Sequence, residues 1–411
     1  MLFLNCAAGA FSAHAQQPAS DPPAAAKPGQ TSVTSTSPPQ KPQPPGKDPP
    51  PDPTLNEEIV RLPLALKLRN GTTRTSEFVL TTFRPNGPGP FPAVVVSHGR
   101  SGGSEKQRAE FGRNRLLRSY WTSRGFAVLA PTRIGYGVSG AAVDPEGMGG
   151  PCDAIDFAPM AEAIAAHIRA TIEYAAAQPW IDKRNVLLVG GSVGGFGSVT
   201  AAGERLAGVK AVVNFAGGAS GWINKRQERP CSSGNVELLL AKAARDGGAI
   251  PSLWLYAEND RHWGPAVPRR WHAAYVAAGG TAEFHMLPPL GEDGHDVVAL
   301  GGEHWRPLLD RFLASLGYAP RKAPPGAPRP TGYARVENVA ALALVSPNCR
   351  EIYATFLQKD VPRAFAIGPN GSCVYATGQP DVMVKSLGRC GEVATGACKL
   401  YAVNDDVVWV P

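Results

Sequence analysis

Residues 185–197 read Asn185-Val-Leu-Leu-Val-Gly-Gly-Ser-Val-Gly-Gly-Phe-Gly197, and the rest of the fold can be worked out from them. A β-branched and aliphatic run leads directly into glycines and one hydroxyl, Ser192, and then into small residues that can begin a helix. Gly190, Ser192 and Gly194 match the G-x-S-x-G pattern, in which a serine occupies a strained strand-to-helix turn. The chain can reverse there only where the neighbouring side chains are minimal. The stretch therefore predicts a nucleophile elbow with Ser192 at the bend.

Two alternatives exist for this glycine-rich stretch. It could be a turn that only packs, or it could be a dinucleotide-binding loop. A dinucleotide loop needs G-x-G-x-x-G spacing and a ribose-binding acid at a set distance after the first βα unit, and neither is present. The residues that follow in the chain favour the elbow.

Composition limits the class of protein. A chain of 411 residues has room for one large domain and a second small one, and a hydrophobic content of 43% can supply a sizeable core. The formal charge is +7, but the basic residues are dispersed and the aromatic content is 8%. This argues against nucleic acid as a partner.

The N-terminal segment has the features of an export signal. Residues 1–15 contain no charged Asp, Glu, Lys or Arg side chain and end in Ala13-His14-Ala15, an A-x-A cleavage pattern. A basic n-region is missing, so we expect a truncated start. Removal of residues 1–15 takes away Cys6 and leaves six cysteines, an even number that suits disulfides in an oxidising compartment. No later run is apolar enough to span a bilayer, and the sequence predicts a periplasmic or secreted protein.

The chain divides into segments of different composition. Residues 16–58 are proline-rich and cannot bury a core, so we expect an extended linker. Residues 59–318 alternate strands and helices, which predicts a mostly parallel sheet covered on both faces. The expected strands span 62–68, 78–83, 91–97, 126–130, 186–189, 209–215, 251–256 and 282–287, and the longest helices span 107–123 and about 157–177.

Two polar residues follow later strands and can join Ser192. Asp260 comes just after the strand expected at 251–256, and His295 lies in a loop after the strand at 282–287. Alone, such an aspartate would be a turn or helix-cap residue, and a loop histidine would be merely exposed. The order serine, acid, histidine, each at the carboxyl end of a strand, instead predicts a catalytic triad. Four other histidines fit less well, because they lie within helices or too close to the acid: His167, His262, His272 and His304.

Residues 59–318 resemble an α/β-hydrolase of the branch related to dienelactone hydrolase. The resemblance rests on five motifs: His98-Gly99, Pro131-Thr-Arg-Ile-Gly-Tyr-Gly-Val-Ser139, the elbow, Leu253-Trp-Leu-Tyr-Ala-Glu-Asn-Asp260 and Leu287-Pro-Pro-Leu-Gly-Glu-Asp-Gly-His295. It implies an eight-stranded sheet and a hydrolase. Dienelactone hydrolases proper carry a cysteine nucleophile, and the serine found here favours ordinary carboxylic esters.

The residue types predict the chemistry. His295 can take the proton of Ser192 near neutral pH, and Asp260 would hold the ring in the right tautomer. The backbone N–H groups of Val193 and Arg100 are the candidates for the oxyanion hole. Tyr136 is a candidate for binding the substrate. This chemistry requires no metal and no organic cofactor, and its partner is a small ester.

Residues 319–331 form a second proline-rich linker, and residues 332–411 are expected to be a separate small α+β unit. Its expected helices span 346–357 and 381–390, and its strands span 363–367, 372–376, 399–403 and 407–410. The unit resembles a small domain at the ends of various bacterial exported proteins, through Cys390, Cys398-Lys-Leu-Tyr-Ala-Val403 and Val407-Val-Trp409. The resemblance brings no function, and contact with the cell envelope is one expectation.

Cysteine spacing favours disulfides over metal. Four of the cysteines lie in the C-terminal unit without a C-x-x-C pair, which argues against zinc. A domain this small outside the cytoplasm is more readily stabilised by disulfides. The expected pairs are Cys390–Cys398, Cys349–Cys373 and, between two loops that each follow a strand, Cys152–Cys231. Two buried thiols are the alternative for the last pair.

Three classes of function fit these features. The first is an exported serine esterase. The second is a serine peptidase of the prolyl-oligopeptidase kind, which usually carries a large β-propeller before the hydrolase domain. The third is a non-catalytic envelope-binding protein that acts through its C-terminal unit. The complete set of serine, acid and histidine favours the first two.

Overall fold

The computed structural model describes residues 56–318 and 326–411, apart from 86, 88, 101–114, 141–143, 222–226, 343–344, 360 and 379–380. The expected signal peptide, nearly all of the first linker and residues 319–325 of the second linker lie outside the described residues. The segment boundaries derived from composition therefore stay predictions.

Among the described residues, eight strands form one sheet in the order β1-β2-β4-β3-β5-β6-β7-β8. Strands β1, β2 and β4 pair antiparallel, and the remaining neighbours pair parallel. The strand bounds are β1 Glu57–Lys67, β2 Thr73–Phe83, β3 Phe91–Ser97, β4 Ala127–Thr132, β5 Ile181–Gly191, β6 Val209–Phe215, β7 Ser252–Ala257 and β8 Ala282–Leu287. The mostly parallel eight-stranded sheet is confirmed.

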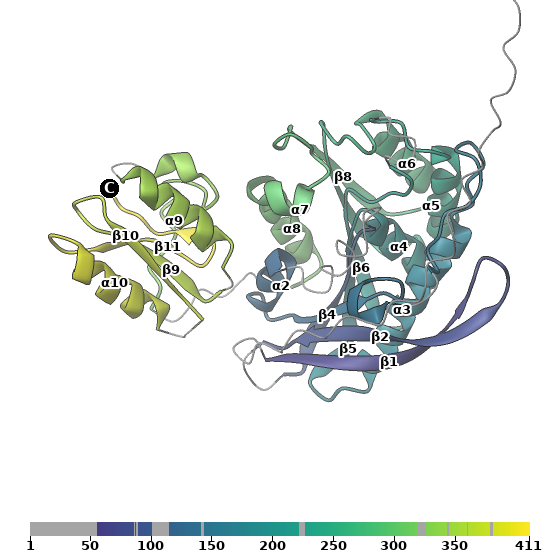
Figure 1. Ribbon diagram of the computed structural model, residues 1–411, viewed down its shortest axis with the longest axis horizontal. Coiled ribbons are helices and arrows are strands. Elements are labelled where there is room, and N and C mark those ends of the chain that lie inside the picture. Colours follow the sequence, from purple (N-terminus) through teal and green to yellow (C-terminus); the bar gives the residue numbers. More distant parts are fainter. Residues whose placement is uncertain are drawn as a thin grey trace, which may run out of the picture. The chain divides into compact units, whose positions relative to one another are not determined.

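Helices cover both faces of this sheet (Figure 1). The helices α2, α7 and α8 lie on one face, and α3, α4, α5 and α6 lie on the other. Their bounds are α2 Arg115–Thr122, α3 Ala158–Ala176, α4 Val193–Ala202, α5 Ser233–Gly247, α6 Ala266–Ala277, α7 Val297–Leu300 and α8 Gly302–Ser315. Residues 186–189 of β5 are almost completely buried, as expected for a central parallel strand with both faces covered.

Several strands and helices begin or end at other residues than the sequence predicts. Strands β1 and β2 each begin five residues before the expected position. Residues 57–61 of β1 pair with residues 79–83 of β2, and the first five residues of β2 are mostly exposed and polar. The expected helix 107–123 is described only as α2, since 101–114 lie outside the described residues. The last expected strand, 407–410, was wrong at its end, because β12 spans Asp406–Val407 and Val410 is 63% exposed.

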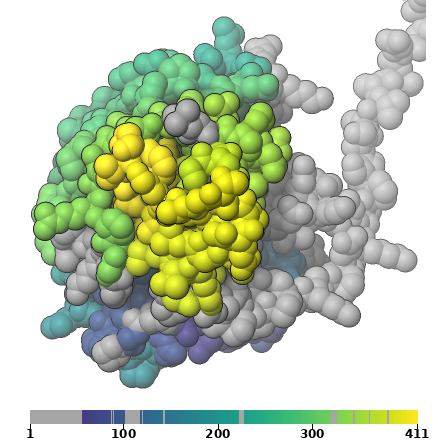
Figure 2. Space-filling view, turned by 90° about the vertical axis from the view of Figure 1, so that its left-hand side faces the viewer, coloured from purple at the N-terminus to yellow at the C-terminus, as the bar shows by residue number. Residues whose placement is uncertain are grey.

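The C-terminal domain has its own sheet, β10-β9-β11-β12, in which all neighbours pair antiparallel. Its elements are α9 Pro347–Leu357, β9 Arg363–Ile367, β10 Cys373–Thr377, α10 Val382–Val393, β11 Lys399–Val403 and β12. Phe365 packs in a cluster with residues of α9, and its neighbour Ala364 packs in a second cluster with Val382 of α10. The alternation of side chains along β9 therefore separates two small cores, one on each face. The last residues of the chain, coloured yellow, gather in one compact region (Figure 2).

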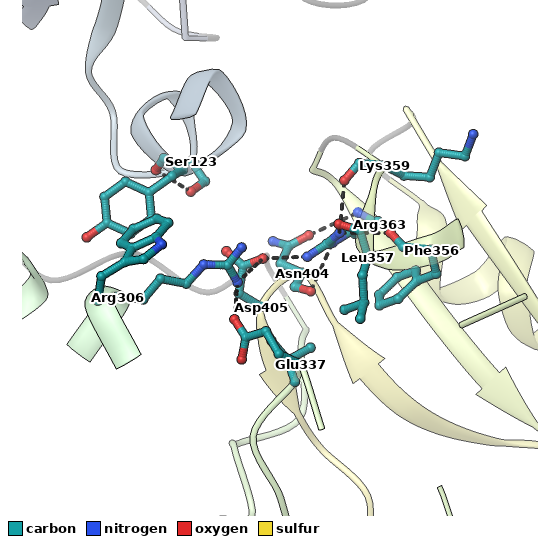
Figure 3. Close-up of polar contacts among 12 residues, drawn as sticks. Ser123, Arg306, Glu337, Phe356, Leu357, Lys359, Arg363, Asn404 and Asp405 are labelled. Atoms are coloured by element: carbon teal, nitrogen blue, oxygen red, sulfur yellow. Dashed lines mark hydrogen bonds and ion pairs between the residues drawn. The ribbon is translucent and has the colours of Figure 1, made fainter. Parts of the chain in front are cut away.

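In this domain the buried Arg363 bonds to the end of α9 and to Asp405 (Figure 3). Arg363 is 2% exposed, and its guanidinium donates to the carbonyl oxygens of Phe356 (2.8 Å), Leu357 (2.6 Å) and Lys359 (3.0 Å) at the end of α9. It also pairs with Asp405 at 2.7 Å. The positive charge thus satisfies carbonyl groups that have no partner within the helix. Burial lowers the pKa of Arg363.

The three disulfides of the structure are the three expected pairs, Cys152–Cys231, Cys349–Cys373 and Cys390–Cys398. Cys349 lies in α9 and Cys373 begins β10, so this bond joins one helix to the sheet of the C-terminal domain. Cys6 lies outside the described residues. None of the described helices is both long and apolar enough to cross a membrane.

Candidate active site

Ser192 lies at the junction of β5 and α4, in a backbone conformation (φ 54°, ψ −127°) that few side chains tolerate. Its N–H donates to the carbonyl of Phe215 (2.9 Å), and its own carbonyl accepts from Phe196 (3.1 Å) and Gly218 (3.2 Å). A Cβ atom at Gly194 would overlap the carbonyl groups of the 97–98 segment. The strained turn is therefore held from both sides, and glycine is required where α4 passes the end of β3.

The structure brings Ser192, His295 and Asp260 together from three separate loops. His295 Nε2 lies 3.0 Å from Ser192 Oγ, and His295 Nδ1 lies 3.0 Å from Asp260 Oδ2. Asp260 is fully buried, whereas the His295 side chain is 13% exposed. Because the carboxylate accepts the Nδ1–H, the lone pair of Nε2 faces the serine hydroxyl. This arrangement can move a proton between Oγ and the ring.

The two loops that carry the acid and the histidine are bonded to each other. Oδ1 of Asp260 accepts from the backbone N–H groups of His262 (2.7 Å) and Trp263 (3.1 Å). Oδ1 of Asp293 accepts from the N–H of His295 and from the N–H of Arg261, both at 3.0 Å. The position of the imidazole relative to the carboxylate is therefore set by backbone as well as side-chain bonds.

The two residues predicted to supply the oxyanion hole, Val193 and Arg100, lie at the start of α4 and directly after Gly99. Val193 is the first residue of α4, so its N–H has no acceptor within the helix. Gly99 lies against the serine, since a Cβ there would be 3.3 Å from Ser192 Cβ. The Arg100 side chain pairs with Asp144 at 2.6 Å.

Tyr136 and His304 each contact a glutamate side chain. Tyr136 is 1% exposed and its hydroxyl donates to Glu146 (2.7 Å), so a role in substrate binding stays a prediction. His304 lies in α8 and pairs with its neighbour Glu303 at 3.1 Å.

The sequence did not predict the stacking of His262 on His295 or the buried ion pair between Arg133 and Glu146. His262, set aside as too close to the acid, stacks on His295 with ring centroids 3.7 Å apart. Burial and the neighbouring His295 lower the pKa of His262 to about 4. Arg133 and Glu146 form an ion pair in which both side chains are completely buried. Arg133 belongs to the Pro131–Ser139 motif, which pointed to the family without indicating what this side chain contacts.

One group of potential metal ligands occurs among the described residues. Asp260, His262 and His295 bring three ligand atoms within 4.8 Å of one another. The two imidazoles stack at an interplanar angle of 22°, so their nitrogen lone pairs lie in nearly parallel planes. A metal ion binds in the plane of a histidine ring and could not lie in both planes. The stacked rings therefore do not direct their lone pairs to one ion position, and the hydrogen bonds of this group join Asp260 to His295 and His295 to Ser192.

No family model and no curated protein matches the sequence. In structure, the chain is similar to a Klebsiella pneumoniae protein assigned as a dienelactone hydrolase, at 19% identity over 64% of this chain and 100% of that one, with a TM-score of 0.40. An esterase from Pyrococcus furiosus has 13% identity over 66% and 96% of the two chains and a TM-score of 0.45.

A prolyl endopeptidase is also similar, with 19% identity over 66% of this chain and 40% of that one and a TM-score of 0.43. In this chain a mostly parallel eight-stranded sheet carries a serine on the sharp turn between β5 and α4, which is the arrangement of an α/β-hydrolase. The chain has the α/β-hydrolase fold. At such identities the likeness concerns the fold alone, and the reaction must be argued from the site.

Proposed function

We propose that this chain is an exported serine hydrolase that cleaves carboxylic esters through an acyl-enzyme on Ser192. One observation carries the proposal: 3.0 Å contacts join Ser192 Oγ to His295 Nε2 and His295 Nδ1 to Asp260 Oδ2. A serine hydroxyl is a weak nucleophile until a base takes its proton. The contacts supply the base and the carboxylate that orients it.

In the proposed reaction, Ser192 Oγ bonds to the carbonyl carbon of the ester while its proton passes to His295 Nε2. The tetrahedral intermediate then collapses, and the alcohol leaves with the proton from Nε2. Water next gives a proton to Nε2 and attacks the acyl-serine carbon. The acid is released when the proton returns to Ser192 Oγ, so the enzyme ends as it began.

The negative charge on the carbonyl oxygen needs fixed donors. The N–H of Val193 begins α4, where the helix dipole also favours a negative charge. The N–H of Arg100 follows Gly99, which lies against Ser192. Both donors belong to the main chain, so the proposal assigns no oxyanion role to the Arg100 guanidinium.

Export is part of the proposal. The three disulfides among the described residues suit an oxidising compartment. The even number of cysteines left after removal of residues 1–15 agrees with this. Contact of the C-terminal domain with the cell envelope stays a prediction.

The proposal is tested with a fluorophosphonate probe and a panel of p-nitrophenyl esters of increasing acyl length. The wild-type protein should be labelled and should release nitrophenol, and Ser192→Ala should do neither. His295→Ala should lose most of the activity, whereas His304→Ala should retain it. Faster cleavage of proline-containing amides than of every ester would favour the peptidase alternative. A protein that neither labels nor cleaves would be the envelope-binding alternative.

A further inference from the structure

The buried guanidinium of Arg133 contacts the backbone just before Arg100, whose N–H is one of the two predicted oxyanion donors. Arg133 follows β4 and is completely buried. Its Nη1 donates to the carbonyl of His98 (2.7 Å), and its Nη2 lies 3.3 Å from the carbonyl of Gly99. These carbonyl groups are consecutive, and the peptide that joins Gly99 to Arg100 supplies the N–H in question. One side chain thus restrains the segment on which the predicted oxyanion hole depends.

The ring of His98 restrains the same peptide. The backbone N–H of Arg133 donates to His98 Nε2 (3.1 Å), so this nitrogen carries no proton. Burial, followed by the charge of Arg133, lowers the pKa of His98 and keeps the ring neutral. The proton therefore resides on Nδ1, which donates to the carbonyl of Gly99 (2.7 Å).

The direction of the Arg100 N–H follows from these contacts. In a planar trans peptide, the C=O of one residue and the N–H of the next point in opposite directions. The Gly99 carbonyl is held by both the His98 ring and the Arg133 guanidinium. The Arg100 N–H is consequently fixed on the other side of the peptide, away from Arg133.

The guanidinium is itself held in place. Glu146, also completely buried, accepts from Arg133 Nε, and its Oε2 lies 3.3 Å from Nη2. The Tyr136 hydroxyl donates to the same carboxylate at 2.7 Å. The next backbone N–H, that of Ile134, donates to Nε2 of the buried His167 (2.9 Å). Because taking two charges out of water is costly, a buried pair like this stabilises a fold no better than apolar residues would.

We infer that Arg133 is a positioning residue, which with Glu146 and His98 holds the Gly99–Arg100 peptide so that its N–H serves the oxyanion. The inference rests on the proposed function. It assigns Arg133 no contact with the substrate. Its effect belongs to the charged transition state, so loss of the guanidinium lowers kcat more than it raises KM.

The test compares Arg133→Met/Glu146→Leu with wild-type protein on an oxygen ester and on the matching thionoester. The double variant removes both charges together, because Arg133→Met alone would leave the buried Glu146 carboxylate with only the Tyr136 hydroxyl at 2.7 Å and the Arg100 guanidinium at 4.0 Å. Thiocarbonyl sulfur is a weak hydrogen-bond acceptor and gains little from an oxyanion hole. For the oxygen ester, kcat should fall about 10- to 100-fold with KM nearly unchanged. The rate on the thionoester should fall much less.

Two further variants complete the test. Arg133→Lys keeps the charge but lacks the planar fork that reaches two carbonyls, and it should show an intermediate loss of kcat without unfolding. Arg169→Met is the matched control, since Arg169 pairs on the surface of α3 with Glu162 and Glu204. It should leave both rates unchanged. The melting temperature of each variant is measured alongside.

The outcomes separate the two proposals. If both Arg133 variants kept kcat within threefold, or if the oxygen ester and the thionoester lost the same factor, the positioning role would be wrong and the esterase would stand. If wild-type protein showed no hydrolysis that depends on Ser192, the proposed function would fall and this inference with it.

Discussion

The imidazole of His262 stacks on that of His295, with ring centroids 3.7 Å apart and an interplanar angle of 22°. Burial and the nearby His295 lower the pKa of His262 to about 4, so the ring is neutral at neutral pH. It therefore supports the proposed base by packing and adds no charge beside it. Replacement by another flat ring should preserve this support, and removal of the ring should not.

We predict that His262→Phe keeps kcat for a simple ester within about threefold, and that His262→Ala lowers it about 10-fold because His295 gains rotamer freedom. Steady-state kinetics of the two variants, together with their melting temperatures, checks this. Equal losses in both variants would show that a nitrogen atom of His262, and not its stacking, matters.

The strained backbone of Ser192 predicts that replacing this residue by glycine raises stability while abolishing activity. Its φ of 54° is unfavourable for any residue with a Cβ, and glycine relieves that cost of about 1–3 kcal/mol. Ser192→Gly and Ser192→Ala both lack the hydroxyl, so both should be inactive. Ser192→Gly should nevertheless unfold at a higher urea concentration than Ser192→Ala. The opposite order in a urea titration would mean that the turn stores no strain.

The close approach of α4 to the end of β3 predicts that Gly194 tolerates no side chain. A Cβ there would overlap the carbonyl oxygens of Ser97 and His98, and neither main-chain group can move away freely. Gly194→Ala should lower the free energy of unfolding by about 1–3 kcal/mol or more and abolish the activity.

The control is Gly234→Ala in α5, where an added Cβ meets nothing within 4 Å. It should be neutral or stabilising by up to about 1 kcal/mol. Chemical denaturation of both variants provides the measurement. A stable and active Gly194→Ala protein would contradict the described packing of the elbow.

Two neutral histidines, the buried His167 and the partly buried His98, predict a loss of stability in mild acid. Burial lowers the pKa of His98 well below its usual value and that of His167 to about 3. In the unfolded chain each would titrate near pH ~6.5, so below that pH the unfolded state binds more protons than the folded one. Stability is therefore complete above about pH 6.5 and falls as the pH drops, by up to about 1.4 kcal/mol per unit for each histidine.

Urea denaturation at pH 7.5, 6.5 and 5.5 tests this, because ordinary carboxylates stay mostly ionised over that range. The ring resonances of the two histidines should remain in their neutral positions in NMR spectra of the folded protein down to pH 5.5. A free energy of unfolding that did not change with pH would contradict their burial in neutral form.

The disulfide Cys152–Cys231 predicts that loss of this bond lowers the free energy of unfolding. It closes a loop with a sequence separation of 79, and Ser232 Oγ donates to the Cys152 carbonyl at 2.8 Å beside it. Cys152→Ser/Cys231→Ser should lower the free energy of unfolding by about 2–4 kcal/mol. Alkylation of protein from an oxidising compartment, followed by mass measurement, should find no free thiol in residues 16–411. Two or more labelled cysteines would contradict at least one of the pairs.

Much of the fold follows from short stretches read by themselves. The strands at 91–97, 209–215 and 282–287 have the expected bounds. For the buried run at 91–97, a continuous apolar stretch between polar turns has few other structures open to it. The glycines around Ser192 likewise predict the turn, because its backbone angles depend on immediate neighbours. Ends of elements were less predictable where exposed polar residues extend a strand, as at the start of β2.

The sequence by itself showed that a serine, an aspartate and a histidine each follow a strand of the sheet. Because the carboxyl ends of parallel strands lie at one edge of a sheet, these residues were expected to lie close together. That is why Ser192, Asp260 and His295 could be named together before their distances were known. Only the tertiary structure decided that His262 stacks on His295 and that Arg133 reaches the carbonyls of His98 and Gly99. These contacts join loops distant in the chain, and their geometry depends on how the loops pack, which no local pattern encodes.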